Sequence, residues 1–359
     1  MNMSTRKNWK RYGFLFFAVA LPIAAYFILA ERASWRPRLL MKTRAEITSL
    51  DFSPGGGVLA LTSSHLLETG RNNHYVSLFD MKSHRQEKIF NTNNYYLDDV
   101  EFSSKVQLLA VSLAKSTGSS INNKGCVLLH DLHNRKQLKL IDTGNQYPSV
   151  SFVPDAEILA VATWWAGHDT KGRDIYDGSV KLYSSRTGNQ LRTLSPSGIA
   201  FHGVTSSPDG KWVAAANGGK IYLWDARTGT NAGTLRLGMW KGIWDNVGSF
   251  EFSPDSRVVA SSSEMTLTLW DRASGKKLWR TDKFPFFFLR FSPDGKTLAT
   301  TTEDTVIHLW NWRTKQHLRR LTTTPLGAKT QIISLTFNPD GNYLIAGDQE
   351  GHVVQWRVK

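Results

Sequence analysis

The chain has 359 residues, of which 41% are apolar and 21% charged, and this ordinary globular balance argues against disorder over most of its length. Its single cysteine, Cys126, excludes an intramolecular disulfide and a cysteine-based zinc site. The net charge of +14 raises the question of nucleic acid, but residues 1–44 alone carry +8 of it. A basic cluster beside a hydrophobic segment favours a membrane surface, and nucleic acid is an unlikely partner.

An uncharged apolar segment, residues 12–30, follows a basic N-terminal tail, residues 1–11. As a helix, residues 12–30 would span about 28 Å, close to the roughly 30 Å hydrocarbon core of a bilayer. We therefore expect a transmembrane helix or signal anchor, followed by a juxtamembrane linker over residues 31–37. A cleaved secretory signal is the alternative, because small residues, Ala24 and Ala25, interrupt the run. The apolar run continues past them, which favours the anchor.

Basic residues on both sides of this segment are expected to face lipid head groups. They are Arg6, Lys7, Lys10, Arg11, Arg32, Arg36 and Arg38. The short basic tail favours a cytoplasmic N-terminus, which predicts a single-pass protein with the rest of the chain on the exoplasmic or periplasmic side. The basic residues that follow the segment act against this orientation.

One motif recurs seven times after residue 46: an alternating strand that ends in Phe-Ser-Pro-Asp-Gly or a related sequence. Its proline positions are 54, 154, 208, 254, 293 and 339, with Ser104 in place of proline in the second repeat. The spacings of 39 to 54 residues suit four short strands per repeat. Pro-Asp-Gly specifies a tight turn, and the apolar strand that follows it is expected to be buried on both faces between neighbouring sheets.

A Trp-Asp pair ends the third strand of several repeats, as in Trp224-Asp225, Trp270-Asp271 and, with asparagine, Trp310-Asn311. Degenerate versions are Phe79-Asp80, His130-Asp131, Tyr183-Ser184 and Trp356-Arg357. With these motifs in phase, residues 38–359 resemble the WD-repeat (WD40-type) β-propeller family. The resemblance implies an all-β, seven-bladed β-propeller in which the repeat tryptophans are core residues. The family's Gly-His dipeptide and its buried histidine are essentially missing.

Closure of the ring is expected to involve both ends of residues 38–359. The seventh repeat has three strands, so the segment Arg38-Leu39-Leu40-Met41-Lys42 is predicted to supply the outer strand of blade seven. Propellers of this family close in that way, which protects the sheet edge.

Three consecutive second-to-third connections are long: residues 62–74, 112–125 and 162–178. Blades 1–3 are neighbours, so these loops are expected to form one raised ridge, and loops longer than about 12 residues are often functional. Aromatic residues and arginine on such a surface suit partner binding. The candidates are Trp164, Trp165, His168, Arg173 and Tyr176 in the third loop, with Tyr95, Tyr96, Tyr147, His202, Trp240 and Trp244 in adjacent fourth-to-first connections. The alternative for Trp164 and Trp165 is simple packing of the loop.

No catalytic constellation is visible, and we expect no cofactor. His168, Asp169, Asp174 and Asp177 lie close in sequence, but their spacing matches no calcium loop, so no metal site is predicted. We see no ring of His, Asp or Arg at matching repeat positions. The sequence thus predicts a membrane-tethered scaffold, not an enzyme, that binds a protein or peptide through the loop face of blades 1–3. The alternative is a propeller enzyme or small-ligand sensor that uses the central channel.

Overall fold

The computed structural model describes residues 35–359 apart from short internal gaps. The gaps are residues 65–73, 93–94, 106, 116–123, 145, 169–173, 196–197, 241–242, 245, 264–265, 303–305 and 324–329. The predicted membrane segment, residues 12–30, and all but two of the predicted lipid-facing residues lie outside the described residues. Within the described part, no helix has the length and apolar character needed to cross a membrane.

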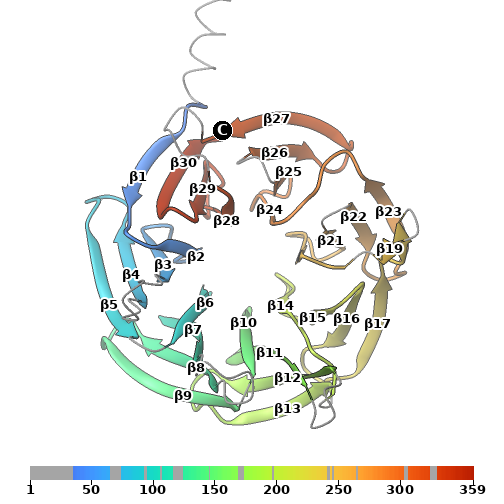
Figure 1. Cartoon of the computed structure of the whole chain (residues 1–359), viewed down its shortest axis with the longest axis horizontal. Coiled ribbons are helices and arrows are strands. Elements are labelled where there is room, and N and C mark those ends of the chain that lie inside the picture. Colours follow the sequence, from blue (N-terminus) through green and yellow to red (C-terminus); the bar gives the residue numbers. More distant parts are fainter. Residues whose placement is uncertain are drawn as a thin grey trace, which may run out of the picture.

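Seven four-stranded antiparallel sheets stand around a central channel, which confirms the predicted seven-bladed propeller (Figure 1). Blade 1 contains β2 (Glu46–Phe52), β3 (Val58–Ser64), β4 (His74–Asp80) and β5 (Gln86–Thr92). Blade 2 contains β6 (Tyr96–Phe102), β7 (Leu108–Lys115), β8 (Lys124–Asp131) and β9 (Lys136–Gly144). Blade 3 contains β10 (Tyr147–Val153), β11 (Ile158–His168), β12 (Asp174–Ser184) and β13 (Gln190–Ser195).

The remaining blades repeat this order from the channel to the rim. Blade 4 contains β14 (Gly203–Ser206), β15 (Trp212–Asn217), β16 (Lys220–Asp225) and β17 (Asn231–Arg236). Blade 5 contains β20 (Ser249–Phe252), β21 (Val258–Ser262), β22 (Leu267–Asp271) and β23 (Lys277–Thr281). Blade 6 contains β24 (Leu289–Phe291), β25 (Thr297–Thr301), β26 (Val306–Asn311) and β27 (Gln316–Thr322). A short hairpin, β18 (Met239–Trp240) with β19 (Ile243–Trp244), connects blades 4 and 5.

Blade 7 closes the ring as predicted. Its strands β28 (Ile332–Phe337), β29 (Tyr343–Asp348) and β30 (His352–Arg357) are completed by β1 (Arg38–Lys42). Arg38 pairs with Gln355 and Lys42 with His352, so the two strands run antiparallel. The closure removes the sheet edge that β30 would otherwise expose.

The hydrophobic core is divided among the seams between adjacent blades. The second strands are buried on both faces, as β21 shows with five consecutive buried residues. One seam cluster joins Ile47 and Leu61 of blade 1 to Ile345 and Val353 of blade 7. Because each blade buries its faces only against its neighbours, the ring has no single core, and each seam must fill its own volume.

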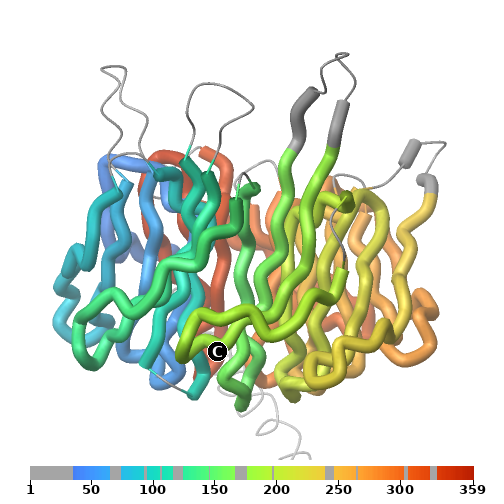
Figure 2. The backbone as a smooth tube through the Cα atoms, turned by 90° about the horizontal axis from the view of Figure 1, so that it is seen from below, coloured from blue at the N-terminus to red at the C-terminus, as the bar shows by residue number. Residues whose placement is uncertain are grey.

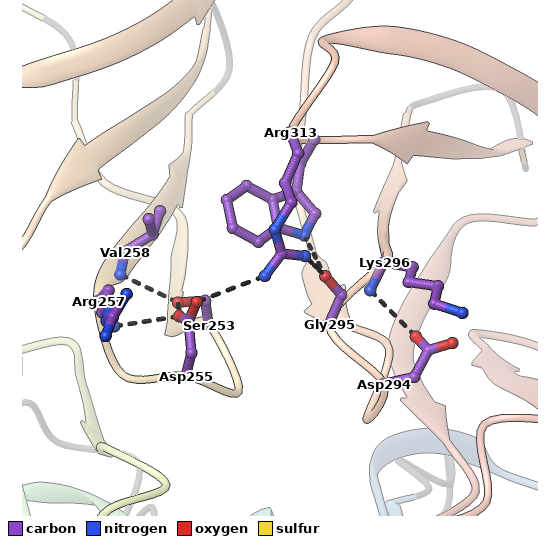
Figure 3. Close-up of polar contacts among 9 residues, drawn as sticks. Ser253, Asp255, Arg257, Val258, Asp294, Gly295, Lys296 and Arg313 are labelled. Carbon is purple, nitrogen blue, oxygen red and sulfur yellow. Dashed lines mark hydrogen bonds and ion pairs between the residues drawn. The ribbon is translucent and has the colours of Figure 1, made fainter.

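The Ser-Pro-Asp-Gly turns are closed by their own side chains. In blade 5, the backbone N–H of Val258 donates to Ser253 Oγ over 3.0 Å, and Ser253 Oγ donates to Asp255 Oδ1 over 2.6 Å (Figure 3). Arg313 of blade 6 then reaches Asp255 Oδ2 at 3.4 Å and also donates to the Gly295 carbonyl. The turn residues therefore connect neighbouring blades as well as adjacent strands.

The repeat Trp-Asp pairs have two separate structural roles. The tryptophans are buried, as predicted, and the Nε1 atoms of Trp270 and Trp310 donate to Ser261 Oγ (2.9 Å) and Thr300 Oγ1 (3.0 Å). The aspartate closes the following turn: Asp225 accepts from the backbone N–H of Thr228 over 2.6 Å. This bond holds the pKa of the Asp225 carboxyl below its usual value.

Candidate partner-binding site

The second strands of blades 1–3 all end on one face of the disc, which we call the loop face (Figure 2). The three long connections that the sequence singles out therefore start on the same side, as predicted. Their central residues, 65–73, 116–123 and 169–173, lie outside the described residues. The Ser-Pro-Asp-Gly turns lie on the opposite face, because they follow the first strands and those run the other way.

The third connection is a β-ribbon, so the prediction of a loop over residues 162–178 is wrong. Strands β11 and β12 pair without a bulge from Ile158 opposite Ser184 to His168 opposite Asp174. The run Val161-Ala162-Thr163-Trp164-Trp165 is rich in residues that favour strands, which extends the pairing beyond the disc. Tyr176 lies on this ribbon with 59% of its surface exposed.

Asp177 fixes the base of the ribbon to the connections on either side of it. Its Oδ1 accepts from the backbone N–H of Gly198 over 2.6 Å, and its Oδ2 accepts from Gln146 Nε2 over 3.0 Å. Gln146 Oε1 in turn accepts from Thr163 Oγ1 over 2.6 Å. Gly178 follows Asp177 in β12. A Cβ on Gly178 would lie 2.0 Å from the Thr163 carbonyl oxygen, so only glycine fits at this position. The base of the ribbon is thus held firmly.

Three of the candidate aromatic residues form a row across blades 3 and 4. Trp164 stacks on Tyr147 with ring centroids 5.0 Å apart, and lies 5.2 Å from the ring of His202. Partial burial lowers the pKa of His202, so its imidazole is neutral near pH 7. Trp164 therefore packs, as the alternative interpretation held, while the row as a whole presents aromatic surface on the loop face.

Tyr95 and Tyr96 lie at the seam between blades 1 and 2, apart from that row. Tyr96 contacts the ring of His74, with centroids 4.9 Å apart, and the Tyr95 carbonyl accepts from Thr92 Oγ1 over 2.9 Å. Trp240 and Trp244 lie on the β18–β19 hairpin beyond blade 4, so the structure does not group them with the ribbon (Figure 1). The side chains of His168, Arg173, Trp240 and Trp244 are outside the described set.

The central channel carries a ring of polar side chains at one repeat position, although only Asp51 and Arg290 are of the residue types, His, Asp or Arg, for which the sequence indicated no ring. The position lies three residues before the repeat proline, or before Ser104 in blade 2, and its occupants are Asp51, Glu101, Ser151, Thr205, Glu251, Arg290 and Thr336. The six side chains from blades 1–6, together with Asp99, line a hollow of about 200 Å³. The polar residue at this fixed distance before the turn of each motif was the available sequence signal.

Most of these channel side chains reach the backbone of the next blade. Asp51 accepts from the N–H of Phe102 over 2.7 Å, and Glu251 accepts from the N–H of Phe291 over 2.7 Å. Burial raises the pKa of Asp51 and of Glu251 to about 7, although the nearby Arg290 acts in the opposite direction. The described residues contain no group of three or more His, Cys, Asp and Glu suited to a metal ion.

Blade 7 contains a buried histidine at the start of its third strand. His352 follows Gly351, and its Nδ1 lies 2.8 Å from Asp348 Oδ2, with both side chains buried. Asp348 Oδ1 also accepts from the backbone N–H of His352 over 2.8 Å. The pair closes the turn between β29 and β30.

Four segments match the family described as "WD domain, G-beta repeat": residues 188–225, 237–271, 285–311 and 319–357. Each segment ends directly after a repeat tryptophan. These are WD40 repeats. They cover the second half of the chain, where the Trp-Asp pairs are best preserved, and the β-sheets of blades 1–3 continue the same pattern with degenerate motifs.

Several known proteins share part of this sequence. The chain is 25% identical over 212 residues to the target of rapamycin complex subunit wat1 of Schizosaccharomyces pombe, covering 58% of this chain and 62% of that protein. It is 22% identical to the target of rapamycin complex subunit LST8 of Mus musculus, covering 51% and 55%. The matches thus span a little over half of each relative. The small ribosomal subunit protein RACK1y of Oryza sativa is 32% identical over 31% of this chain and 34% of its own length.

A solved structure described as that of the mitotic checkpoint complex contains a chain of the same fold. The two superpose with a TM-score of 0.69 at 17% identity, covering 90% of this chain and 91% of the other. At this identity the likeness establishes the seven-bladed fold alone.

Proposed function

We propose that the protein is a membrane-tethered WD-repeat scaffold that binds a protein or peptide partner through the loop face of blades 1–3. A protein-interaction role fits the relatives, two of which are named as subunits of a complex. The observation that carries the choice of face is the β11–β12 ribbon. It projects from the disc, it is fixed at its base by Asp177, and it bears the exposed Tyr176 next to an aromatic row.

The ribbon suits recognition because hydrogen bonds already fix its base, so binding a partner costs little conformational entropy there. Exposed aromatic side chains on a rigid support contribute large contact area at low entropic cost. Trp165 lies opposite Asp177 on the ribbon, one pair from Tyr176 opposite Ala166. We assign Trp165 and Tyr176 to the partner, and because they belong to adjacent pairs of the ribbon their side chains point to its two opposite faces.

The tether is supported by the sequence of residues 12–30 and by the direction of β1. Trp35 packs near Val358 on the turn face, and Arg36 and Arg38 are exposed there. A membrane segment that precedes Trp35 would hold the turn face towards the bilayer and the loop face away from it. Protease accessibility of the propeller in sealed vesicles tests the tether and its exoplasmic or periplasmic orientation together.

Partner binding is tested with the double variant Trp165→Ala/Tyr176→Ala. Affinity capture from the native membrane, quantified by mass spectrometry, should lose the proteins that the wild type retains, while the melting temperature stays within about 2 °C. Leu318→Ala is the matched control, because Leu318 is 49% exposed on β27 of the distant blade 6. Unchanged capture by the double variant contradicts binding at this face.

The channel supports a second candidate function, that of a small-ligand sensor. Its hollow of about 200 Å³ is lined by carboxylates and by Arg290, which suits a small polar molecule. Native mass spectrometry of the purified full chain tests this candidate, since a bound small molecule that is lost in Arg290→Ala would support it.

A further inference from the structure

The seam between blades 1 and 2 is hollow at the position where other blades carry a tryptophan. His130 occupies the repeat position that holds Trp270, Trp310 and Trp356 in other blades. This position is the last but one residue of the third strand. Beside it lies a hollow of about 300 Å³. Imidazole is smaller than indole, so the replacement leaves unfilled the volume that an indole occupies in those blades.

The replacement also removes a hydrogen-bond partner. In blades 5 and 6 the indole N–H donates to a hydroxyl of the second strand, on Ser261 and Thr300. The residue in the same phase of blade 2 is Val111, which has no polar side chain. His130 is 94% buried, and its Nε2 atom has no hydrogen-bond partner. A buried polar atom without a partner costs roughly 1–3 kcal/mol, so a ligand that pairs with it gains that interaction.

The walls of the hollow are largely apolar and aromatic. They include Phe90, Tyr95, Leu113, Cys126, Leu128 and Leu140. Leu140 is 49% exposed on the rim strand β9, and Gln137 beside it is exposed, so the hollow opens at the rim of blade 2. Burial lowers the pKa of His130, which keeps the imidazole neutral near pH 7. The hollow is largely apolar, and among its described lining residues His130 Nε2 is the one buried polar side-chain atom without a hydrogen-bond partner, so it favours a ring that carries a single polar hydrogen.

Another seam of the same molecule already holds an aromatic residue from a separate segment. Trp35, which precedes β1, packs against the core cluster of blades 6 and 7, and the Arg319 guanidinium lies 4.1 Å from its ring centroid. An outside indole can therefore be seated between two blades of this propeller.

We propose that the hollow at His130 binds the indole of a partner's tryptophan side chain, with the indole N–H donating to His130 Nε2. A cavity of about 150 Å³ can hold benzene, so 300 Å³ is sufficient for a bicyclic ring. The proposal deepens the proposed function: it gives the loop-face partner a second contact at the blade 1–2 seam, next to Tyr95.

The sole cysteine of the chain provides the test, because Cys126 lines the hollow. Its rate of modification by a small neutral disulfide reagent is measured on the full chain with and without N-acetyltryptophanamide. We expect saturating probe to slow modification at least fivefold. Indene, which has the shape of indole without the N–H, should bind about fivefold more weakly, the equivalent of roughly 1 kcal/mol. If free indole protects Cys126 from modification and N-acetyltryptophanamide does not, the assignment of the ligand as a tryptophan side chain is overturned.

The variant His130→Trp should fill the hollow from within. Cys126 is then expected to react slowly without any probe, and the probe should have no further effect. His130→Tyr is the second variant, because Tyr183 already occupies this phase in blade 3. Equal protection of Cys126 by the probe in the wild type and in a folded His130→Trp variant would overturn the site. Trp165→Ala/Tyr176→Ala should leave protection intact, so failure of the loop face and failure of this pocket are separable.

Discussion

Asp51 of blade 1 accepts a hydrogen bond from the backbone N–H of Phe102 in blade 2, over 2.7 Å and a sequence separation of 51 residues. The carboxylate therefore joins two blades at the channel wall. It does so in a setting where burial raises its pKa from 3.8 to about 7. The stability of the ring is thus linked to the protonation of the channel.

The pH dependence follows from that shift. Between about pH 4 and pH 7 folded Asp51 keeps a proton that the unfolded chain releases, so stability falls as pH rises through this window and stays lower above it. Asp51→Asn keeps an acceptor for Phe102 and cannot ionise. Urea unfolding should find it more stable than the wild type at pH 8, by on the order of 2 kcal/mol, and nearly equal at pH 4. A less stable variant at pH 8 would mean that attraction to Arg290 outweighs the cost of burial.

Trp35→Ala should weaken the closure of the ring. The variant loses the packing of the indole on blade 7 and its contact with the Arg319 guanidinium, which together contribute about 1–2 kcal/mol for a partly buried side chain. Chemical denaturation measures the loss. Leu39→Ala in the neighbouring strand β1 is the control, since Leu39 is 42% exposed, and an equal effect of the two variants would argue against a specific role for Trp35.

Asp348→Ala should be strongly destabilising. It leaves the N–H groups of His352 and Glu350 and the buried His352 ring without their acceptor, at a cost of roughly 2–4 kcal/mol. Asp348→Asn retains an acceptor and should lose less than half as much. Thermal unfolding of both variants checks this order, and identical losses would show that the charge matters more than the hydrogen bonds.

Asp177→Ala should loosen the ribbon without unfolding the propeller. The Gly198 N–H and Gln146 lose their shared partner, while the pairing of β11 with β12 and the seam cores remain. Hydrogen exchange is expected to accelerate about tenfold at Gly178 and Gly198 and to stay unchanged in β15. Faster exchange throughout blade 4 would indicate a wider structural role.

The repeats could be predicted from sequence because their signals are local. The Pro-Asp-Gly turns and the phase of Trp224, Trp270 and Trp310 specify strands and their order, and neighbouring blades follow from that order. Closure by residues 38–42 could be predicted for the same reason, since blade 7 lacked one strand. Among the candidate site residues, Tyr147, Trp164 and His202 were correctly placed on one face and are brought together.

The remaining features depend on contacts between segments far apart in sequence. The β11–β12 ribbon was missed because residues 166–174 are rich in Gly, His and Asp, which favour turns, whereas cross-strand pairing decides their conformation. The channel ring was missed because its positions hold different side chains, from Asp51 to Arg290. The hollow at His130 depends on how blade 1 packs against blade 2, which no single repeat records.

The pairing of β1 with β30 also sets an order of events during synthesis. Strand β1 leaves the ribosome before β30, which emerges some 310 residues later, so the nascent chain carries an unpaired strand throughout that interval. During that interval, another copy's β30 could receive it, giving a strand-exchanged dimer. Slow translation or crowded polysomes should therefore favour linked pairs of propellers over single rings.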